Sequence, residues 1–313
     1  RALDLRRAKR GIIVCPAAVR ENWRNEFSKF ARMDRRICKG QTIHDFVAWS
    51  KGRYDILVTS YELATKWAPK IHELGEILDF LVIDEAHYLK DAGAQRTKAL
   101  YGPASDGFKG IAMWAEQTWE LSGTRNPNDP MDIYTFLCLV GATNLSKEAF
   151  RRRYFHVRDR QFSSAQTPRK ETLDELRGMI AANCIRRSKA EANIQLPPIF
   201  LTTTVVDGDD SAVRELLGQH PGLEHSIMMA IEMGGLSFLD AQHLMTLRRL
   251  VGEAKAVPYA HMLIDELRSG LDKRVVMGVH KQALATIRDL VARAGFHVVM
   301  ITGETKETDR IAA

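Results

Sequence analysis

Two acids and a histidine stand directly behind an apolar run in the segment "LVIDEAHYLKD", residues 81–91. The run begins at Phe80 and has no polar break before Asp84, which predicts a strand that is buried on both faces. Asp84 and Glu85 would then lie at the carboxyl edge of a sheet, where open α/β folds bind their ligands. Paired carboxylates at such an edge suit a hydrated magnesium ion and a phosphate-attacking water, because Mg²⁺ prefers oxygen ligands.

The same acids also allow a purely structural interpretation. Asp84 could cap the start of a helix, and Glu85 would be favoured there by the helix dipole. The tetrapeptide alone leaves both interpretations open.

Composition and charge narrow the class of protein. The 313 residues suffice for two ordinary domains, and Lys and Arg outnumber Asp and Glu by 45 to 39, which is compatible with a polyanionic partner. The basic clusters at 151–155 and 185–189 fit phosphate contacts or solvated helix faces equally well. No apolar run approaches membrane-spanning length. The four cysteines show no CxxC spacing, so neither a zinc site nor a disulfide framework is expected, and a reducing compartment fits.

Short apolar runs alternate with helical patterns along the first part of the chain, which predicts a parallel sheet with crossover helices. The predicted strands are 11–16, 55–60, 79–86 and 118–124. Between the first two lies a helical pattern over 18–31, in which Trp23 recurs at helical spacing with other apolar residues and is expected in the core.

The remaining segments predict helices and then a second α/β region. Residues 125–195 are expected to be mostly helical with a polar break at 162–170, and 195–207 to link into an extended strand. Helices are predicted over 208–250, 257–270 and 281–295, and strands over 273–280 and 296–305.

Taken in order, these segments resemble the Swi/Snf-type branch of the superfamily-two helicase-like ATPases, the DNA-dependent ATPases that include annealing helicases and bacterial and phage members. "GIIVCPAAVRENWRNEFSKF" is similar to motif Ia, "YDILVTSYEL" to motif Ib, "LVIDEAHYLKD" to the DEAH motif II and "LSGTRNPNDPMDIYTFL" to motif III. "IRRSKAEANIQLPP" is similar to the segment that joins the lobes, and "KRVVMGVH" and "ITGETKETDR" to the start of the second lobe.

The resemblance implies an α/β fold with two RecA-like lobes of the P-loop NTPase helicase core, built on parallel sheets with crossover helices and separated by a helical insertion. Residues 1–140 are expected to form the first lobe, 141–254 the helical insertion and inter-lobe linker, and 255–313 the start of the second lobe. Both ends are expected to be truncated.

The resemblance also assigns roles at the acidic site. Asp84 would hold Mg²⁺ through water, Glu85 would orient the hydrolytic water as general base, and His87 would couple the nucleotide site to motif III, where Ser122, Gly123 and Thr124 match. A satisfied structural histidine is the alternative for His87.

Nucleic-acid contacts are implied at other loops. The matching positions are Cys15 and Pro16 of motif Ia, Thr59, Ser60 and Tyr61 of motif Ib, and Gly303 and Glu304 of the second lobe. Small hydroxyls and backbone N–H groups there would hold the phosphodiester backbone without reading sequence. Arg186 and Arg187 match a family-typical pair that either contacts DNA or links the lobes.

The chain departs from the family pattern in three respects. It contains no Gly-Lys-Thr or Gly-Lys-Ser loop to cradle phosphates, and motifs V and VI do not follow. Arg125 stands where the family usually has proline, and it could meet phosphate or pair with Asp129.

These features favour an ATP- and Mg²⁺-dependent translocase on double-stranded or branched DNA, in a repair, recombination or transcription context. The complete protein would hydrolyse ATP, whereas this chain alone is expected to be inactive. A non-hydrolysing DNA- or protein-binding fragment is the alternative, and an RNA-directed helicase is a weaker one. A cytoplasmic monomer of bacterial or phage source is expected, or a nuclear protein if the source is eukaryotic.

Overall fold

The computed structural model describes residues 9–30, 36–102, 110–123, 129–160, 163–187, 191–193, 195, 197–233, 238–305 and 309. The chain divides into two compact units. The first unit is residues 1–160 with 164–187, and the second is residues 188–313 with 161–163.

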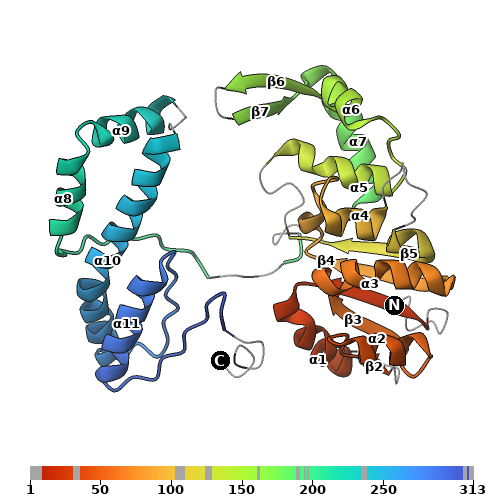
Figure 1. The fold of residues 1–313 in the computed structure, drawn as a ribbon, viewed down its shortest axis with the longest axis horizontal. Helices are drawn as coiled ribbons and strands as arrows, with labels where there is room; N and C mark the ends of the chain where they lie inside the picture. The colour runs from red at the N-terminus through yellow and green to blue at the C-terminus, as the bar shows by residue number, and fades with distance from the viewer. Residues whose placement is uncertain are drawn as a thin grey trace. The chain divides into compact units, whose positions relative to one another are not determined.

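The first unit is built on a five-stranded sheet with the order β2-β3-β1-β4-β5, in which all paired strands are parallel (Figure 1). The strands are β1 (Gly11–Cys15), β2 (Ile37–Cys38), β3 (Ile56–Ser60), β4 (Leu78–Asp84) and β5 (Ala115–Leu121). The four strands predicted from apolar runs are therefore confirmed. The two-residue β2 is too short to leave a pattern in the sequence.

Helices connect these strands as crossovers. They are η1 (Ala17–Val19) and α1 (Arg20–Phe30) after β1, α2 (Ile43–Ser50) after β2, α3 (Tyr61–Leu74) after β3, and η2 (Ala86–Leu89), α4 (Gln95–Tyr101) and η3 (Ile111–Trp114) after β4. A capping box fixes the start of α2, where Thr42 and Asp45 satisfy each other's backbone N–H groups. Gly75 ends α3 in the left-handed conformation that glycine adopts without a steric penalty.

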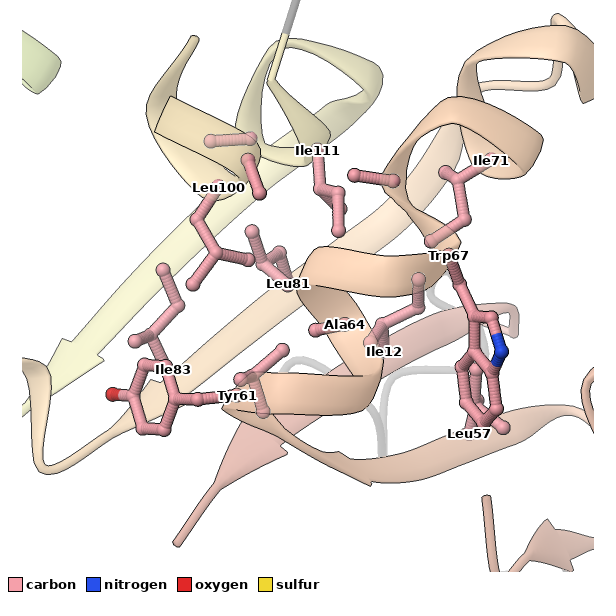
Figure 2. Close-up of a cluster of buried hydrophobic side chains, with 14 of the residues drawn as sticks. Ile12, Leu57, Tyr61, Ala64, Trp67, Ile71, Leu81, Ile83, Leu100 and Ile111 are labelled. Carbon is pink, nitrogen blue, oxygen red and sulfur yellow. The ribbon is translucent and has the colours of Figure 1, made fainter. Parts of the chain in front are cut away.

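The central strands are buried on both faces, and their alternate residues pack into two separate hydrophobic cores. Ile12, Leu57 and Leu81 face the larger core, which α2, α3 and α4 cover (Figure 2). On the other face Ile13, Val58 and the neighbouring strand residues pack against α1 and Trp119. Burial on both faces is why these strands appear in the sequence as continuous apolar runs.

A separate cluster lies beyond β5 in the same unit. It is formed by η4 (Pro130–Ile133), α5 (Tyr134–Leu139), α6 (Lys147–Tyr154) and α7 (Leu173–Asn183), with Phe150 and Phe155 in its core, and η5 (Lys170–Thr172) precedes α7. The strands β6 (Phe155–Arg160) and β7 (Ser163–Pro168) pair here. The helical prediction for 125–195 is wrong over β6, and β7 lies within the predicted polar break at 162–170. Both strands are too polar to show an apolar pattern.

The second unit is helical where its structure is regular. Its helices are α8 (Ser211–Gln219), α9 (Leu223–Met233), α10 (Phe238–Arg268) and α11 (Lys281–Arg293). Leu263, Ile264 and Val291 form a small core between α10 and α11. The predicted helices are confirmed, except that α10 is continuous through 251–256, where the sequence predicted a break between two helices.

The predicted strands at 195–207, 273–280 and 296–305 are wrong as strands, because no described residue of these segments joins a ladder. Val276, Phe296 and Val298 still pack against the α10–α11 core, so the apolar pattern is used without strand pairing. A strand requires hydrogen bonds to a neighbouring strand, and an apolar run does not supply that neighbour. A second RecA-like lobe therefore stays a prediction.

Within the described part of the chain, no helix has the length and apolar character needed to cross a membrane.

Candidate active site

The carboxyl ends of four neighbouring strands meet at one edge of the sheet. Ser60 ends β3, Cys15 ends β1, Asp84 ends β4, and Ser122 follows β5. These strands are parallel and adjacent in the order β3-β1-β4-β5, so the sheet itself brings the groups together. Polar groups gathered at this edge are the usual basis of a site in an open α/β sheet.

Both oxygens of the half-buried Asp84 carboxylate accept one hydrogen bond. Trp23 Nε1 donates to Oδ2 over 2.8 Å, and the Glu85 backbone N–H donates to Oδ1 over 2.9 Å. A carboxylate offers about four lone-pair sites, so roughly two remain for another ligand. The side chain is thus held in one orientation and still has acceptor capacity.

Glu85 has a left-handed backbone, with φ 52° and ψ 47°. Such a conformation is uncommon for a residue other than glycine, and it persists where surrounding contacts enforce it. The Tyr61 hydroxyl supplies such a contact, because it lies 2.6 Å from the Asp84 carbonyl and 3.2 Å from the Glu85 carbonyl. Burial raises the pKa of Tyr61 and the nearby Asp84 carboxylate raises it further, so the phenol stays protonated and donates.

The alternative of a capped helix start is not what the structure contains. A 3₁₀ helix, η2, does follow, but the side chain of its N-cap residue Glu85 makes no capping hydrogen bond. The Asp84 carboxylate bonds the adjacent Glu85 N–H and Trp23 instead. The acids are therefore available for another use.

His87 joins the end of β4 to the end of β5. Its Nδ1 lies 3.1 Å from Glu85 Oε2 and 3.3 Å from Ser122 Oγ. A carboxylate can only accept a hydrogen bond, so the contact with Glu85 requires Nδ1 to carry the hydrogen. The structure thus brings together His87, Glu85 and Ser122, and the coupling role expected for His87 stays a prediction. Gly123 follows Ser122, while Thr124 and Arg125 lie outside the described residues.

The acidic pair has the donor chemistry that a hydrated magnesium ion requires. Among the described residues, no group of three or more His, Cys, Asp or Glu side chains could hold a metal directly. Magnesium keeps several of its waters and commonly uses one or two protein carboxylates together with substrate phosphates. Asp84, with spare lone pairs beside the half-exposed Glu85, fits that mode of binding.

Most side chains predicted to face nucleic acid from motifs Ia and Ib are buried. Cys15, Thr59, Ser60 and Tyr61 are at most 3% exposed, whereas Pro16 is half-buried. The Thr59 hydroxyl donates to the Gly40 carbonyl over 3.1 Å, and Ser60 Oγ caps α3 by accepting from Leu63 N. These side chains therefore hold the strand ends in place, and their contact with nucleic acid stays a prediction.

The other predicted contacts lie elsewhere. Arg186 and Arg187 are exposed and follow α7 in the first unit. Gly303 and Glu304 belong to the second unit, in a turn where Thr302 N donates to Thr305 Oγ1 and Lys281 pairs with Glu304.

Sequence reasoning missed two contacts of this site. Trp23 is half-buried and packs on the sheet, in line with the core prediction, but its indole N–H reaches Asp84. Tyr61 was expected to face nucleic acid, and its hydroxyl instead binds the backbone of the acidic pair. A partly buried tryptophan needs a partner for its N–H, which is a signal for the first contact, but the sequence does not identify the partner.

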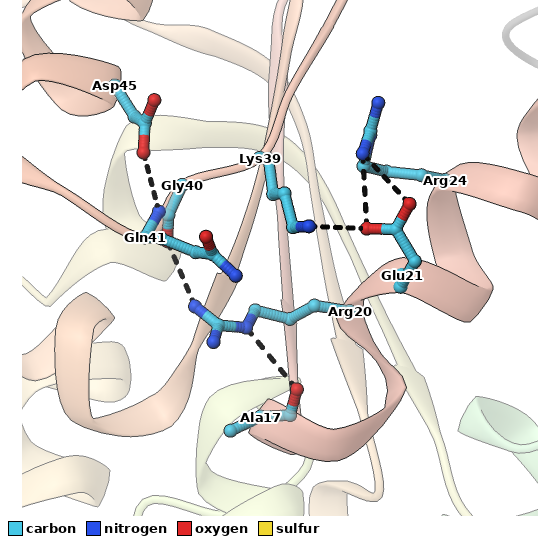
Figure 3. A network of polar contacts seen from close by, with 8 residues as sticks. All are labelled: Ala17, Arg20, Glu21, Arg24, Lys39, Gly40, Gln41 and Asp45. Carbon is cyan, nitrogen blue, oxygen red and sulfur yellow. Dashed lines mark hydrogen bonds and ion pairs between the residues drawn. The ribbon is translucent and has the colours of Figure 1, made fainter. Parts of the chain in front are cut away.

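A polar network anchors α1 beside the site (Figure 3). Arg20 is 7% exposed, and its guanidinium donates to the Gly40 carbonyl over 3.4 Å. Glu21 binds Lys39 over 3.0 Å and Arg24 over 3.0 Å, and the hydrogen bond from Lys39 lowers the pKa of Glu21, with Arg24 adding to the effect. The first turn of α1 is therefore tied to the loop that follows β2.

Comparison with known proteins agrees with this architecture. A family model described as the SNF2-related domain matches residues 4–211, which is more than half of the chain. The chain belongs to the SNF2-related domain family, and the Swi/Snf resemblance of its motifs is confirmed.

The relatives are distant and longer. The chain is 24% identical to DNA repair and recombination protein RAD54B of Gallus gallus, over 61% of this chain and 20% of that protein. It is 23% identical to the SWI/SNF-related matrix-associated actin-dependent regulator of chromatin subfamily A-like protein 1 of Xenopus tropicalis, over 96% of this chain and 30% of that protein. The chain thus spans 20% to 30% of the length of these relatives. The Sulfolobus solfataricus SWI2/SNF2 ATPase core in complex with dsDNA is similar with a TM-score of 0.47 and 18% identity, covering 93% of this chain and 61% of that one.

Proposed function

We propose that the first unit is the catalytic lobe of an ATP- and Mg²⁺-dependent translocase that acts on double-stranded DNA. The observation that supports this most directly is the arrangement at the sheet edge, where Asp84 and Glu85 lie side by side and His87 contacts both Glu85 and Ser122. Membership of the SNF2-related family supports the same proposal.

Each residue has a distinct task in this proposal. Asp84 would hold Mg²⁺ through water with its remaining lone pairs, while Trp23 and the Glu85 N–H fix the orientation of its carboxylate. Glu85 orients the attacking water, and its side chain, 45% exposed, is accessible for that purpose. Magnesium, when bound, neutralises charge on the phosphates.

His87 would relay the state of the nucleotide site to motif III. Its Nδ1 is within reach of both Glu85 and Ser122, so a change in the hydrogen bond on one side alters the bond on the other. His87→Ala is expected to uncouple DNA stimulation from hydrolysis.

The nucleic acid in this proposal is duplex DNA, held by its backbone. The carboxyl ends of β1 and β3, with Pro16 and the first turn of α3, lie at the same sheet edge as the acids. The N-terminus of a helix such as α3 favours anionic groups. A cytoplasmic location and a monomeric state remain predictions.

The test uses Glu85→Gln in the full-length protein, with Glu73→Gln as the matched control. Glu73 lies on the exposed side of α3, away from the sheet edge. Glu85→Gln should abolish DNA-stimulated ATP hydrolysis and leave nucleotide binding intact, because it keeps the shape of the side chain and removes only its basicity. Glu73→Gln should leave turnover unchanged. Turnover retained in Glu85→Gln would remove Glu85 from the catalytic role, and binding of DNA without any hydrolysis in the unsubstituted protein would favour a non-hydrolysing binding module.

A further inference from the structure

We propose that Trp23 and Tyr61 are positioning residues through which the loops at the ends of β1 and β3 control the geometry of Asp84 and Glu85. The proposal rests on the proposed function, because it concerns how DNA at those loops stimulates hydrolysis. It is drawn from two hydrogen bonds that cross from motifs Ia and Ib to motif II.

Trp23 supplies the first connection. It lies in the first turns of α1, shortly after Pro16, and its ring packs on the sheet face formed by residues such as Val82. Packing fixes the ring, so the indole N–H is directed at Asp84 Oδ2 over 2.8 Å. The indole is a neutral donor, so it orients the carboxylate without cancelling the charge that a metal requires.

The anchoring of α1 makes this connection stiff. Arg20 and Glu21, in the turn that precedes Trp23, are bound to Gly40 and Lys39 of the loop after β2 (Figure 3). A displacement at the start of α1 therefore has to move Trp23 with it, and the donor moves relative to Asp84.

Tyr61 supplies the second connection. It is the first residue of α3, directly after the N-cap Ser60, and it is 3% exposed (Figure 2). Its hydroxyl binds the carbonyl of Asp84, and its ring meets Tyr88 edge to face at 5.5 Å. The contact lies at the peptide that leads into the left-handed Glu85, so it holds the backbone from which the Glu85 carboxylate projects.

These two contacts connect the loops after β1 and β3 to the acidic pair Asp84 and Glu85. A phosphate group that engages Pro16 or the N-terminus of α3 displaces the starts of α1 and α3. Those starts hold, by one hydrogen bond each, the side chain of Asp84 and the backbone of Glu85. Outer partners of this kind typically contribute about 10- to 100-fold to metal affinity or activity.

The test removes one hydrogen-bond donor at a time. Trp23→Phe and Tyr61→Phe keep an aromatic ring in place and delete the N–H or the O–H. Trp119→Phe is the matched control for the first, because Trp119 packs on the same sheet face and no described residue accepts from its N–H. Tyr154→Phe is the control for the second, because Tyr154 is as buried as Tyr61 and its hydroxyl donates to Glu175 Oε1 over 2.7 Å in the separate cluster.

The expected result in the full-length protein is a loss of about 10-fold or more in DNA-stimulated turnover for each test variant, with a higher Mg²⁺ concentration needed for half-maximal rate. Both control variants should behave like the unsubstituted protein in these assays. DNA affinity should be unchanged in all four variants, since none of the four side chains needs to touch the DNA. Test variants that match their controls would overturn the proposal.

A second measurement does not depend on turnover. In ¹⁵N-labelled protein, the indole N–H resonance that disappears in Trp23→Phe should move in Asp84→Asn and on titration with Mg²⁺. A resonance that stays in place in Asp84→Asn would overturn the Trp23 connection. The proposed function would fail separately, through turnover retained in Glu85→Gln, so the two failures can be told apart.

Discussion

Gly11 is the position where adding one methyl group should disturb the sheet most directly. It begins β1 and is paired in register with Phe80 of β4, a residue with no exposed surface that stacks on Trp119 at 6.2 Å. A Cβ at position 11 would lie 2.4 Å from Phe80 Cζ, whereas carbon atoms favour about 3.5–4.0 Å. Gly11→Ala therefore forces a packed ring to move.

Two opposing effects determine how much Gly11→Ala changes the free energy of unfolding. Overpacking a core costs about 1–3 kcal/mol. Alanine in place of glycine within a strand recovers roughly 0.5–1 kcal/mol of backbone entropy. The net expectation is a loss of about 1–2 kcal/mol in the free energy of unfolding, measured by urea titration with tryptophan fluorescence.

The cause of this loss can be isolated with Phe80→Leu. The smaller side chain leaves room for the new methyl group, so Gly11→Ala should cost about 1 kcal/mol less in the Phe80→Leu background than in the unsubstituted protein. If Gly11→Ala is as stable as the parent, or if it lowers the free energy of unfolding equally in both backgrounds, the clash with Phe80 is not what governs stability at this position.

Two further predictions concern ionisable groups near the site. The hydrogen bond from Lys39 holds the pKa of Glu21 below its ordinary 4.5, so Glu21 contributes stability above pH 4.5 that is lost as the pH falls through the lowered value. Glu21→Gln should therefore unfold more easily than the parent at pH 7, and this difference should shrink as the pH falls below 4.5. A constant difference across pH would contradict this. Burial raises the pKa of the Cys38 thiol to about 11, with Asp45 adding to the effect, and the Sγ donates to the Asp45 carbonyl. With the other three cysteines replaced by serine, Cys38 should resist Ellman's reagent at pH 8 until urea unfolds the chain, and rapid labelling of the folded protein would show the thiol to be accessible.

The sheet was predictable because its central strands are buried on both faces. A continuous apolar run such as that from Phe80 to Ile83 is typical of a strand that is buried on both faces. The acidic residues that follow were correctly placed at the sheet edge for the same reason, and the contact of His87 with Ser122 followed from the family motifs.

Strand pairing and long-range hydrogen bonds could not be predicted, because they depend on partner residues that a local sequence pattern does not identify. Residues 273–280 have an apolar pattern that suits a strand, but strand pairing requires a neighbour, and the structure has none for them among its described residues. The β6–β7 hairpin is polar and was missed. Trp23 and Asp84 are 61 positions apart, and only the folded sheet reveals that one donates to the other.

The gathering of the candidate groups at one edge of the sheet has a practical consequence for labelling the protein. Every candidate group of the first unit's sheet lies at the carboxyl edge, whereas the exposed turn at 51–54 and the loop at 75–77 lie at the amino edge. Strand β3 is five residues long, so the two edges are about 17 Å apart. A fluorophore on Lys51→Cys, or a tether to a surface at that turn, would leave the acidic edge free, which makes the amino edge the natural point of attachment for single-molecule observation.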